Sequence, residues 1–245
     1  MNPHDEHMYL TGGRVAPVRF RGLPLQRVRE RISSAAVDID RPAPGEELNR
    51  GAETAPRLAA TVIVLRGGAE RLEVLLVKRN PQARFMGGAW VFPGGAVDRQ
   101  EGRGESALRA AALRELREEA GIALRSADEL IPFSRWITPA EVKTRFDTVF
   151  YLASLPPGAT EQVDGREVVD ARWYMPREAL EAASDGELLL VFPTIKHLEQ
   201  LSGFRSAVEL IEHARGREVR PVRPRVLVSG ETARIVLPGE RGYED

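Results

Sequence analysis

The sequence predicts an α/β protein, a sandwich of helices around a mixed β-sheet. Segments rich in β-branched residues alternate with segments of helical periodicity, and a glycine-rich turn stands in the middle of the chain. The composition agrees, because 245 residues with 42% apolar and 29% charged side chains suffice for one globular domain with appendages. We place the core at residues 57–182, between an N-terminal extension and linker (1–56) and a C-terminal region (183–245).

The first strands are predicted directly after the extension. The extension itself has weak periodicity, with one strand and a short helix expected between Val15 and Val37, and Arg41–Pro56 is typical of a linker. Leu58–Arg66 and Arg71–Arg79 are rich in β-branched and aliphatic residues, and a glycine-containing turn separates them. These two segments are predicted to pair as a hairpin.

A glycine-rich segment, Met86–Gly95, leads to the strongest helical pattern of the chain, Glu105–Ala120, with Gly121 as its C-cap. Three strands, three helices and a late hairpin are predicted after it. In chain order these are Ile131–Ile137, Thr148–Leu155, Val168–Tyr174, a helix from Pro176 to about Ser184, a helix from Pro193, a helix capped by Ser206 and Glu209, and the strands Val226–Ser229 and Ala233–Leu237. The C-terminal region is therefore expected to be mainly helical and to pack on the core.

The composition excludes several classes of function. The chain has no cysteine and only four scattered histidines, so oxygen ligands and a hard cation such as Mg²⁺ or Mn²⁺ are expected at any metal site. A formal net charge of -1 predicts no bulk attraction to nucleic acid or to a membrane surface. Without a long apolar run, an N-terminal signal core or a peroxisomal C-terminal address, a cytoplasmic protein is expected.

Three glutamates of the central helix, Glu115, Glu118 and Glu119, are predicted to share one face. At about 100° per residue, Glu118 and Glu119 lie roughly 60° to one side and 40° to the other side of Glu115. Like charges at these spacings destabilise a helix, and a divalent cation would reverse that effect. From the helix alone, a solvated acidic face is the simpler interpretation. The surrounding residues favour a metal site.

Those residues resemble the Nudix hydrolase family. Residues 114–122, Arg-Glu-Leu-Arg-Glu-Glu-Ala-Gly-Ile, match the second half of the Nudix box at every fixed position, and Phe92-Pro93-Gly94-Gly95 matches the turn that opens it. The resemblance covers roughly residues 57–182 and implies an α/β/α sandwich around a mixed sheet. It also implies that Mg²⁺ or Mn²⁺ is held by the three glutamates and that a diphosphate linkage is hydrolysed.

One departure concerns the first half of the box. Twelve residues separate Glu101 from Arg114, where the family has seven, and we interpret this as a five-residue insertion around Arg99–Gly104. Counting back from Arg114 would instead put the first glutamate of the box at Ser106, and Glu105 is a rival for its role. Arg114 itself is placed to hold or neutralise a carboxylate of the helix.

A second motif resembles the coenzyme A diphosphatase branch of the family. Leu75–Asn80, Arg84, Gly88 and residues 92–95 match it at the right spacing, with departures at Val77 and Asn80. The interrupted box, with residues 135–139 and 145–148 downstream, resembles the larger peroxisomal-type acyl-CoA diphosphatases.

This resemblance implies coenzyme A or acyl-CoA as a small, nucleotide-derived substrate. Arg79 and Arg84, with Gly94 and Gly95, are then the expected substrate-binding residues, since arginine binds phosphate with a planar fork. The arginines are equally compatible with solvated strand and loop ends. ADP-ribose, NADH or a nucleotide sugar is the alternative substrate class, and a non-catalytic binding module is the alternative function.

The expected reaction is attack of water on one phosphorus, with a carboxylate as general base. A glutamate of the helix is one possibility for this base, and Glu167 is favoured over Glu161 and Asp164 among the carboxylates of a later loop. Trp136, Phe146 and Trp173 are expected either to line a pocket or to lie in the core. The C-terminal region is expected to cap the pocket or to form a homodimer interface.

Overall fold

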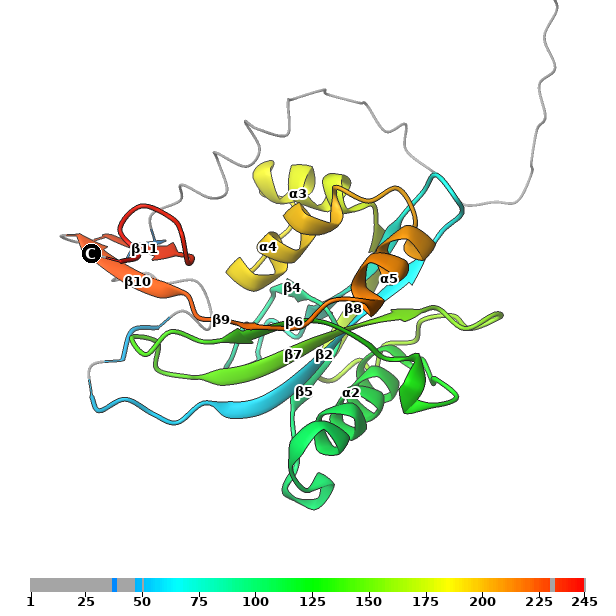
Figure 1. Cartoon of the computed structure of the whole chain (residues 1–245), viewed down its shortest axis with the longest axis horizontal. Coiled ribbons are helices and arrows are strands. Elements are labelled where there is room, and N and C mark those ends of the chain that lie inside the picture. The colour runs from blue at the N-terminus through cyan, green and yellow to red at the C-terminus, as the bar shows by residue number, and fades with distance from the viewer. Residues whose placement is uncertain (1–36, 39–46, 50, 230–231, 245) are drawn as a thin grey trace, which may run out of the picture.

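The computed structural model describes residues 37–38, 47–49, 51–229 and 232–244, which form a mixed β-sheet with helices on both faces (Figure 1). The predicted linker is described only in part. The strand and helix expected between residues 15 and 37 lie outside the described residues, apart from Val37. The predicted α/β/α sandwich is confirmed.

The main sheet has the strand order β4-β3-β2-β7-β6-β9, with β5 beside β2 and β8 beside β3. The strands are β2 Arg57–Arg66, β3 Glu73–Arg79, β4 Trp90–Val91, β5 Gly94–Ala96, β6 Ile131–Ile137, β7 Phe146–Ser154, β8 Val168–Tyr174 and β9 Pro221–Val222. The central pair, β2 and β7, is parallel, whereas β7 and β6 are antiparallel. The sheet is therefore mixed, as predicted.

A split between β2 and β3 is the feature that positions the site. The predicted hairpin exists, but β2 and β3 pair at only two positions, Leu65 with Val74 and Arg66 with Glu73. Farther back along β2, the short strand β5 takes the place of β3, with Thr61 opposite Gly94. Strand β3 has turned away to pair with β4 and β8. The two strands thus leave a gap between them that other side chains can enter.

The strongest predicted helix is α2, Gly104–Ala120, which ends at Gly121 in the left-handed conformation (φ 66°). The inserted segment forms a single 3-10 turn, η1 Arg99–Glu101, and does not interrupt α2. A second short turn, η2 Ala127–Glu129, follows before β6. On one face of the sheet, Val62, Val64 and Tyr151 pack with the apolar stripe of α2 around Leu116. Among the described helices, α2 is the one that covers this face.

Three helices cover part of the opposite face: α3 Pro176–Ser184, α4 Phe192–Leu201 and α5 Ala207–Arg215. Alternate residues of the same strands, such as Ile63, Leu65 and Leu152, pack with Leu180, Leu198, Leu201 and Leu210 of these helices. The alternation of side chains along a strand explains why one strand serves two apolar cores. No helix among the described residues is long and apolar enough to cross a membrane.

The late hairpin is confirmed as β10 Arg225–Ser229 and β11 Thr232–Val236, and β11 also pairs with β1, Val37–Asp38. Two features of the strands at this side of the main sheet were not predicted. Strand β9 pairs in parallel with the edge strand β6, with Val222 opposite Trp136. Strand β7 begins at Phe146, two residues early, because Phe146 continues the ladder opposite Arg57.

Candidate active site

The carboxylate of Glu119, in the last turn of α2, lies in the split of the sheet. One of its oxygens accepts the backbone N–H of Gly94 on β5 at 2.9 Å, and the other lies 3.4 Å from the guanidinium of Arg79 on β3. The side chain is only 3% exposed. Glu119 therefore contacts both strands that border the gap and anchors the end of α2 there.

Two glycines make this close approach possible. A Cβ at Gly94 would lie 2.5 Å from the carbonyl oxygen of Ala60 and 2.6 Å from Cα of Thr61. A Cβ at Gly95 would lie 2.2 Å from Oε1 of Glu115. The contacts at Gly94 are with backbone atoms, so β5 can pair with β2 only with glycine there. A side chain at position 95 would instead displace the carboxylate of Glu115.

Arg114 ties together the carboxylates on the outer side of α2. Its guanidinium donates to Glu101 at 2.9 Å, to Glu115 at 2.7 Å and to Glu118 at 3.2 Å. Glu105, the rival for the first glutamate of the box, instead contacts Arg109 and the hydroxyl of Tyr151. The arrangement thus favours Glu101 as that glutamate, because the 3-10 turn carries it to Arg114 despite the insertion.

The electrostatics of the site are those of crowded carboxylates. Burial raises the pKa of Glu119 to about 7, and the negative charges of Glu115 and Glu167 act in the same direction. Burial also raises the pKa of Glu115, with contributions from Glu118 and Glu167, against the opposing effect of Arg114. Burial, more than the neighbouring charges, therefore makes these two glutamates difficult to ionise.

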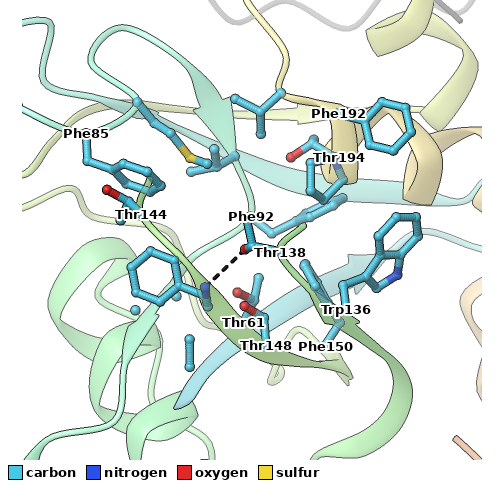
Figure 2. A pocket seen from close by; sticks show the side chains of 18 of the residues that line it. Thr61, Phe85, Phe92, Trp136, Thr138, Thr144, Thr148, Phe150, Phe192 and Thr194 are labelled. Atoms are coloured by element: carbon cyan, nitrogen blue, oxygen red, sulfur yellow. Dashed lines mark hydrogen bonds between the residues drawn. The ribbon is translucent and has the colours of Figure 1, made fainter. Parts of the chain in front are cut away.

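A cavity of about 360 Å³ opens from these glutamates across the sheet. Glu115, Glu119, Glu167 and Arg79 lie at its charged end. Figure 2 shows the remainder as aromatic rings and threonine side chains that point into one space. They come from β2, β6, β7 and the start of α4, from the segments between β3 and β5, and from the loop between β6 and β7: Thr61, Phe85, Phe92, Trp136, Thr138, Thr144, Phe146, Thr148, Phe150, Phe192 and Thr194.

Not every predicted site residue reaches this cavity. Glu115, Glu119, Arg79, Gly94 and Gly95 line it. Glu118 is 60% exposed at its side chain and turns toward Arg114 outside the cavity. Arg84 is exposed in the loop after β3 and does not line the cavity either. Sequence spacing could not show this, because a loop of ten residues after β3 leaves the direction of Arg84 undetermined.

The later loop separates the three candidates for the general base. Glu161 accepts the indole N–H of Trp173, and Asp164 accepts the backbone N–H groups of Glu167 and Val168. Both carboxylates thus hold the loop in shape. Glu167 lines the cavity beside the helix glutamates. Of the predicted aromatic residues, Trp136 and Phe146 line the cavity and Trp173 does not.

The sequence interpretation missed the threonines of the cavity and two residues of the C-terminal segment, Pro224 and Ile235. A signal for the threonines exists. Thr61 stands on the same side of β2 as the buried Ile63 and Leu65, and Thr148 has the same relation to Phe150 and Leu152 on β7. A threonine among apolar residues on the buried side of a strand therefore indicates where that side of the strand borders the cavity.

The donor set suits a hard divalent cation. No three carboxylate or histidine side chains converge on one point within the described ranges, since Arg114 and Arg79 hold the glutamates apart. Nevertheless, Glu115 and Glu119 are oxygen donors with raised pKa values at the end of a cavity. A dication would favour their ionised forms, so the residues present fit Mg²⁺ or Mn²⁺.

The comparisons with known proteins agree with this geometry. The NUDIX domain family matches residues 55–192, more than half of the chain. A crystal structure of a Nudix hydrolase from Alicyclobacillus acidocaldarius is 27% identical, with a TM-score of 0.58 over 66% of this chain and 97% of that one.

Two curated relatives match part of the chain. A Caenorhabditis elegans protein named "Putative nudix hydrolase 7" is 30% identical over 180 residues, which cover 60% of either chain. The human acyl-coenzyme A diphosphatase NUDT19 is 31% identical over 116 residues, 45% of this chain and 31% of the human protein. The chain thus spans less than two thirds of the length of each of these relatives.

Proposed function

Because the chain belongs to the Nudix family, we propose that it hydrolyses a diphosphate linkage in a nucleoside diphosphate derivative, with Mg²⁺ or Mn²⁺ as cofactor. One observation carries this proposal: a buried carboxylate, Glu119, stands with Glu115 and Glu167 at the charged end of a largely apolar cavity. Burial makes Glu115 and Glu119 costly to ionise even though Arg114 and Arg79 contact them, unless a cation compensates their charge. A dication with the phosphates of a substrate would do so.

The residues have separate roles in this proposal. Glu115 and Glu119 would hold the cation, with Glu118 close enough on α2 to join them once it leaves Arg114. When bound, the cation lowers the pKa of water and offsets charge on the phosphates. Arg114 fixes the orientation of Glu115 and of Glu101. Arg79 neutralises Glu119 until substrate arrives.

The chemical step is an in-line displacement at phosphorus. The oxygen of a water molecule forms a new bond to one phosphorus, and the bond between that same phosphorus and the bridging anhydride oxygen breaks. Glu167 takes the proton of the water and later releases it to solvent. The leaving group departs as a phosphate monoester, so atoms and charge balance without a further reactant.

Coenzyme A or acyl-CoA is the substrate that we propose. The Leu75–Asn80 and Phe92–Gly95 motif supports it, as does the similarity to a protein named acyl-coenzyme A diphosphatase. The cavity supports it too, because its aromatic and threonine lining suits an uncharged arm with few hydrogen-bonding groups. The products would be 3',5'-ADP and 4'-phosphopantetheine, or its acyl form.

The test is an incubation of the full chain with coenzyme A and Mg²⁺ in ¹⁸O-labelled water, with the products resolved by mass spectrometry. We expect the two products named above, with one ¹⁸O atom in only one of them, and no turnover when EDTA removes the cation. Intact coenzyme A alongside hydrolysed ADP-ribose would contradict the proposed substrate. Hydrolysis of neither would contradict the proposed activity.

A further inference from the structure

The C-terminal hairpin borders the cavity at the end opposite the glutamates. Pro224, just before β10, and Ile235 of β11 are lining residues, although both lie outside residues 55–192, which match the family. Strand β9 fixes this segment in place, because Val222 pairs with Trp136 on the sheet edge. The wall of the cavity is thus completed by a part of the chain that the shared domain does not supply.

The order of the strands sets the distance between the two ends. The glutamates lie over β5 at one side, and β2, β7 and β6 follow before the hairpin. Three strand spacings of about 4.8 Å separate β5 from β6, or roughly 14 Å across the sheet. A ligand with its diphosphate at Glu119 must therefore extend a long arm to reach Ile235.

The lining of the far end is uncharged. The residues there are Trp136, Ile137, Pro139, Phe192, Pro224 and Ile235, with the hydroxyls of Thr138 and Thr194 as the polar groups. Among the described lining residues, charged side chains occur only at the glutamate end. A nucleotide base or a phosphate placed at the far end would lose hydrogen bonds to water without replacement, at a cost of about 1–3 kcal/mol for each unpaired group. An apolar group would lose nothing.

We propose that the far end of the cavity binds the acyl chain of an acyl-CoA, and that Ile235 limits the size of the chain that is accepted. This inference rests on the proposed function, since it requires the diphosphate of the substrate to lie at Glu119. The C-terminal hairpin is accordingly a specificity element of the enzyme and takes no part in the chemical step.

Two substitutions to tryptophan in the full chain test this inference. Ile235→Trp adds bulk inside the cavity wall, whereas Val228→Trp adds the same bulk at a position of the hairpin that is 57% exposed. For each variant, kcat/KM is measured with coenzyme A and with lauroyl-CoA. We expect Ile235→Trp to lower the ratio of lauroyl-CoA to coenzyme A at least tenfold, while Val228→Trp leaves the ratio within twofold of the unsubstituted chain.

A binding measurement separates failure of this inference from failure of the proposed function. Fluorescence of the neutral dye Nile red reports on the apolar end without any reaction, and we expect Ile235→Trp alone to weaken its binding at least fivefold. Equal effects of both tryptophans, or an equal loss on both substrates, would overturn the role of Ile235. If the unsubstituted chain cleaves neither substrate, the proposed function fails and the acyl assignment falls with it, even where the dye still binds. Should Ile235→Trp not fold, Ile235→Ala tests the same limit in the opposite direction. It must raise the ratio of lauroyl-CoA to coenzyme A by threefold or more, and an unchanged or lowered ratio would overturn the role of Ile235.

Discussion

Two halves of one sheet face differ sharply in what covers them. At one end of β2 and β7, Ile63, Leu65 and Leu152 are buried beneath α3 and α4. At the other end of the same strands, Thr61 and Thr148 line an open cavity (Figure 2). The backbone ladder is continuous through both halves. The boundary between the apolar core and the cavity is therefore set by the size of the side chains and by the place where α3 and α4 no longer cover the sheet.

The proposed catalytic residues and the residues of the apolar core therefore stand on the same strands and the same helix. On α2, Leu116 is fully buried against the sheet, whereas Glu119, three residues later, extends into the split between β2 and β3. A substitution in the open half should therefore affect turnover more than folding, and one in the closed half should do the reverse. The predictions below test this division, from the largest expected effect to the smallest.

The largest effect is expected for Glu119→Gln, which preserves shape and removes charge. Loss of a metal-binding carboxylate forfeits several kcal/mol of transition-state stabilisation, so we expect kcat to fall on the order of a thousandfold. The amide oxygen can still accept the N–H of Gly94, so Tm should fall by only a few degrees. Glu70→Gln, in the exposed turn after β2, is the control and should change neither quantity. Turnover above a tenth of normal in Glu119→Gln would contradict the assignment.

In the closed half, Leu152→Ala should reduce stability with little effect on chemistry. Leu152 is fully buried beneath the helices, and a cavity of that kind costs about 2–5 kcal/mol. Urea unfolding measures the change, and kcat at 20 °C should stay within threefold of the unsubstituted chain. A loss of stability below 1 kcal/mol would show that the two halves are less different than the structure indicates.

His197, on the boundary of the two halves, should make stability depend on pH. The ring of His197 is buried among Phe92, Phe150 and Trp136. Its Nε2 atom lies 2.6 Å from the hydroxyl of Ser134, and its Nδ1 atom lies 2.6 Å from the carbonyl oxygen of Pro193. Burial lowers its pKa from 6.5 to about 4, against the weaker opposing effect of that carbonyl. The carbonyl can only accept, so Nδ1 carries the proton and Nε2 accepts from Ser134.

The sign of the pH effect follows from which state binds the proton. Between pH 6.5 and 4 the unfolded chain binds a proton on this residue and the folded chain does not, so the free energy of unfolding falls as pH falls. The slope is about 1.4 kcal/mol per pH unit, or up to about 3 kcal/mol over this window, and is absent above pH 6.5. The difference between the unsubstituted chain and His197→Phe isolates this contribution, and a difference that does not vary with pH would refute it.

The smallest effect is expected for Thr148→Val, which exchanges one hydroxyl of the open half for a methyl group. One hydrogen bond to substrate is worth about 1 kcal/mol, so KM should rise about fivefold with kcat little changed. Tm should stay within about 3 °C, because valine fills the same volume on a strand. If KM is unchanged while Tm falls further, Thr148 belongs to the core half.

The local features of the site could be predicted from the sequence. Helix α2, its end at Gly121 and the two glycines of the turn follow from short-range spacing, because each depends on residues within a few positions. The position of Glu167 in the cavity agrees with the preference for this residue over Glu161 and Asp164. The placement of Glu167 next to the helix glutamates, by contrast, depends on the distant pairing of β8 with β3.

Features that depend on long-range pairing could not be predicted. The split between β2 and β3 arises because β3 pairs with β8, about a hundred residues away along the chain. The exposed direction of Arg84 and the turn of Glu118 toward Arg114 depend on loops and on charge pairs that spacing does not encode. The participation of Ile235 requires β9 to dock on β6, for which the two-residue strand gives almost no signal.

The most direct test of the central claim is a titration of the full chain with Mn²⁺, followed by electron paramagnetic resonance of the free ion. The account predicts at least one bound Mn²⁺ per chain, and a dissociation constant at least tenfold higher in Glu119→Gln with the Tm of that variant nearly unchanged. Equal binding of Mn²⁺ by both chains would contradict the claim that the glutamate in the split of the sheet holds the cation.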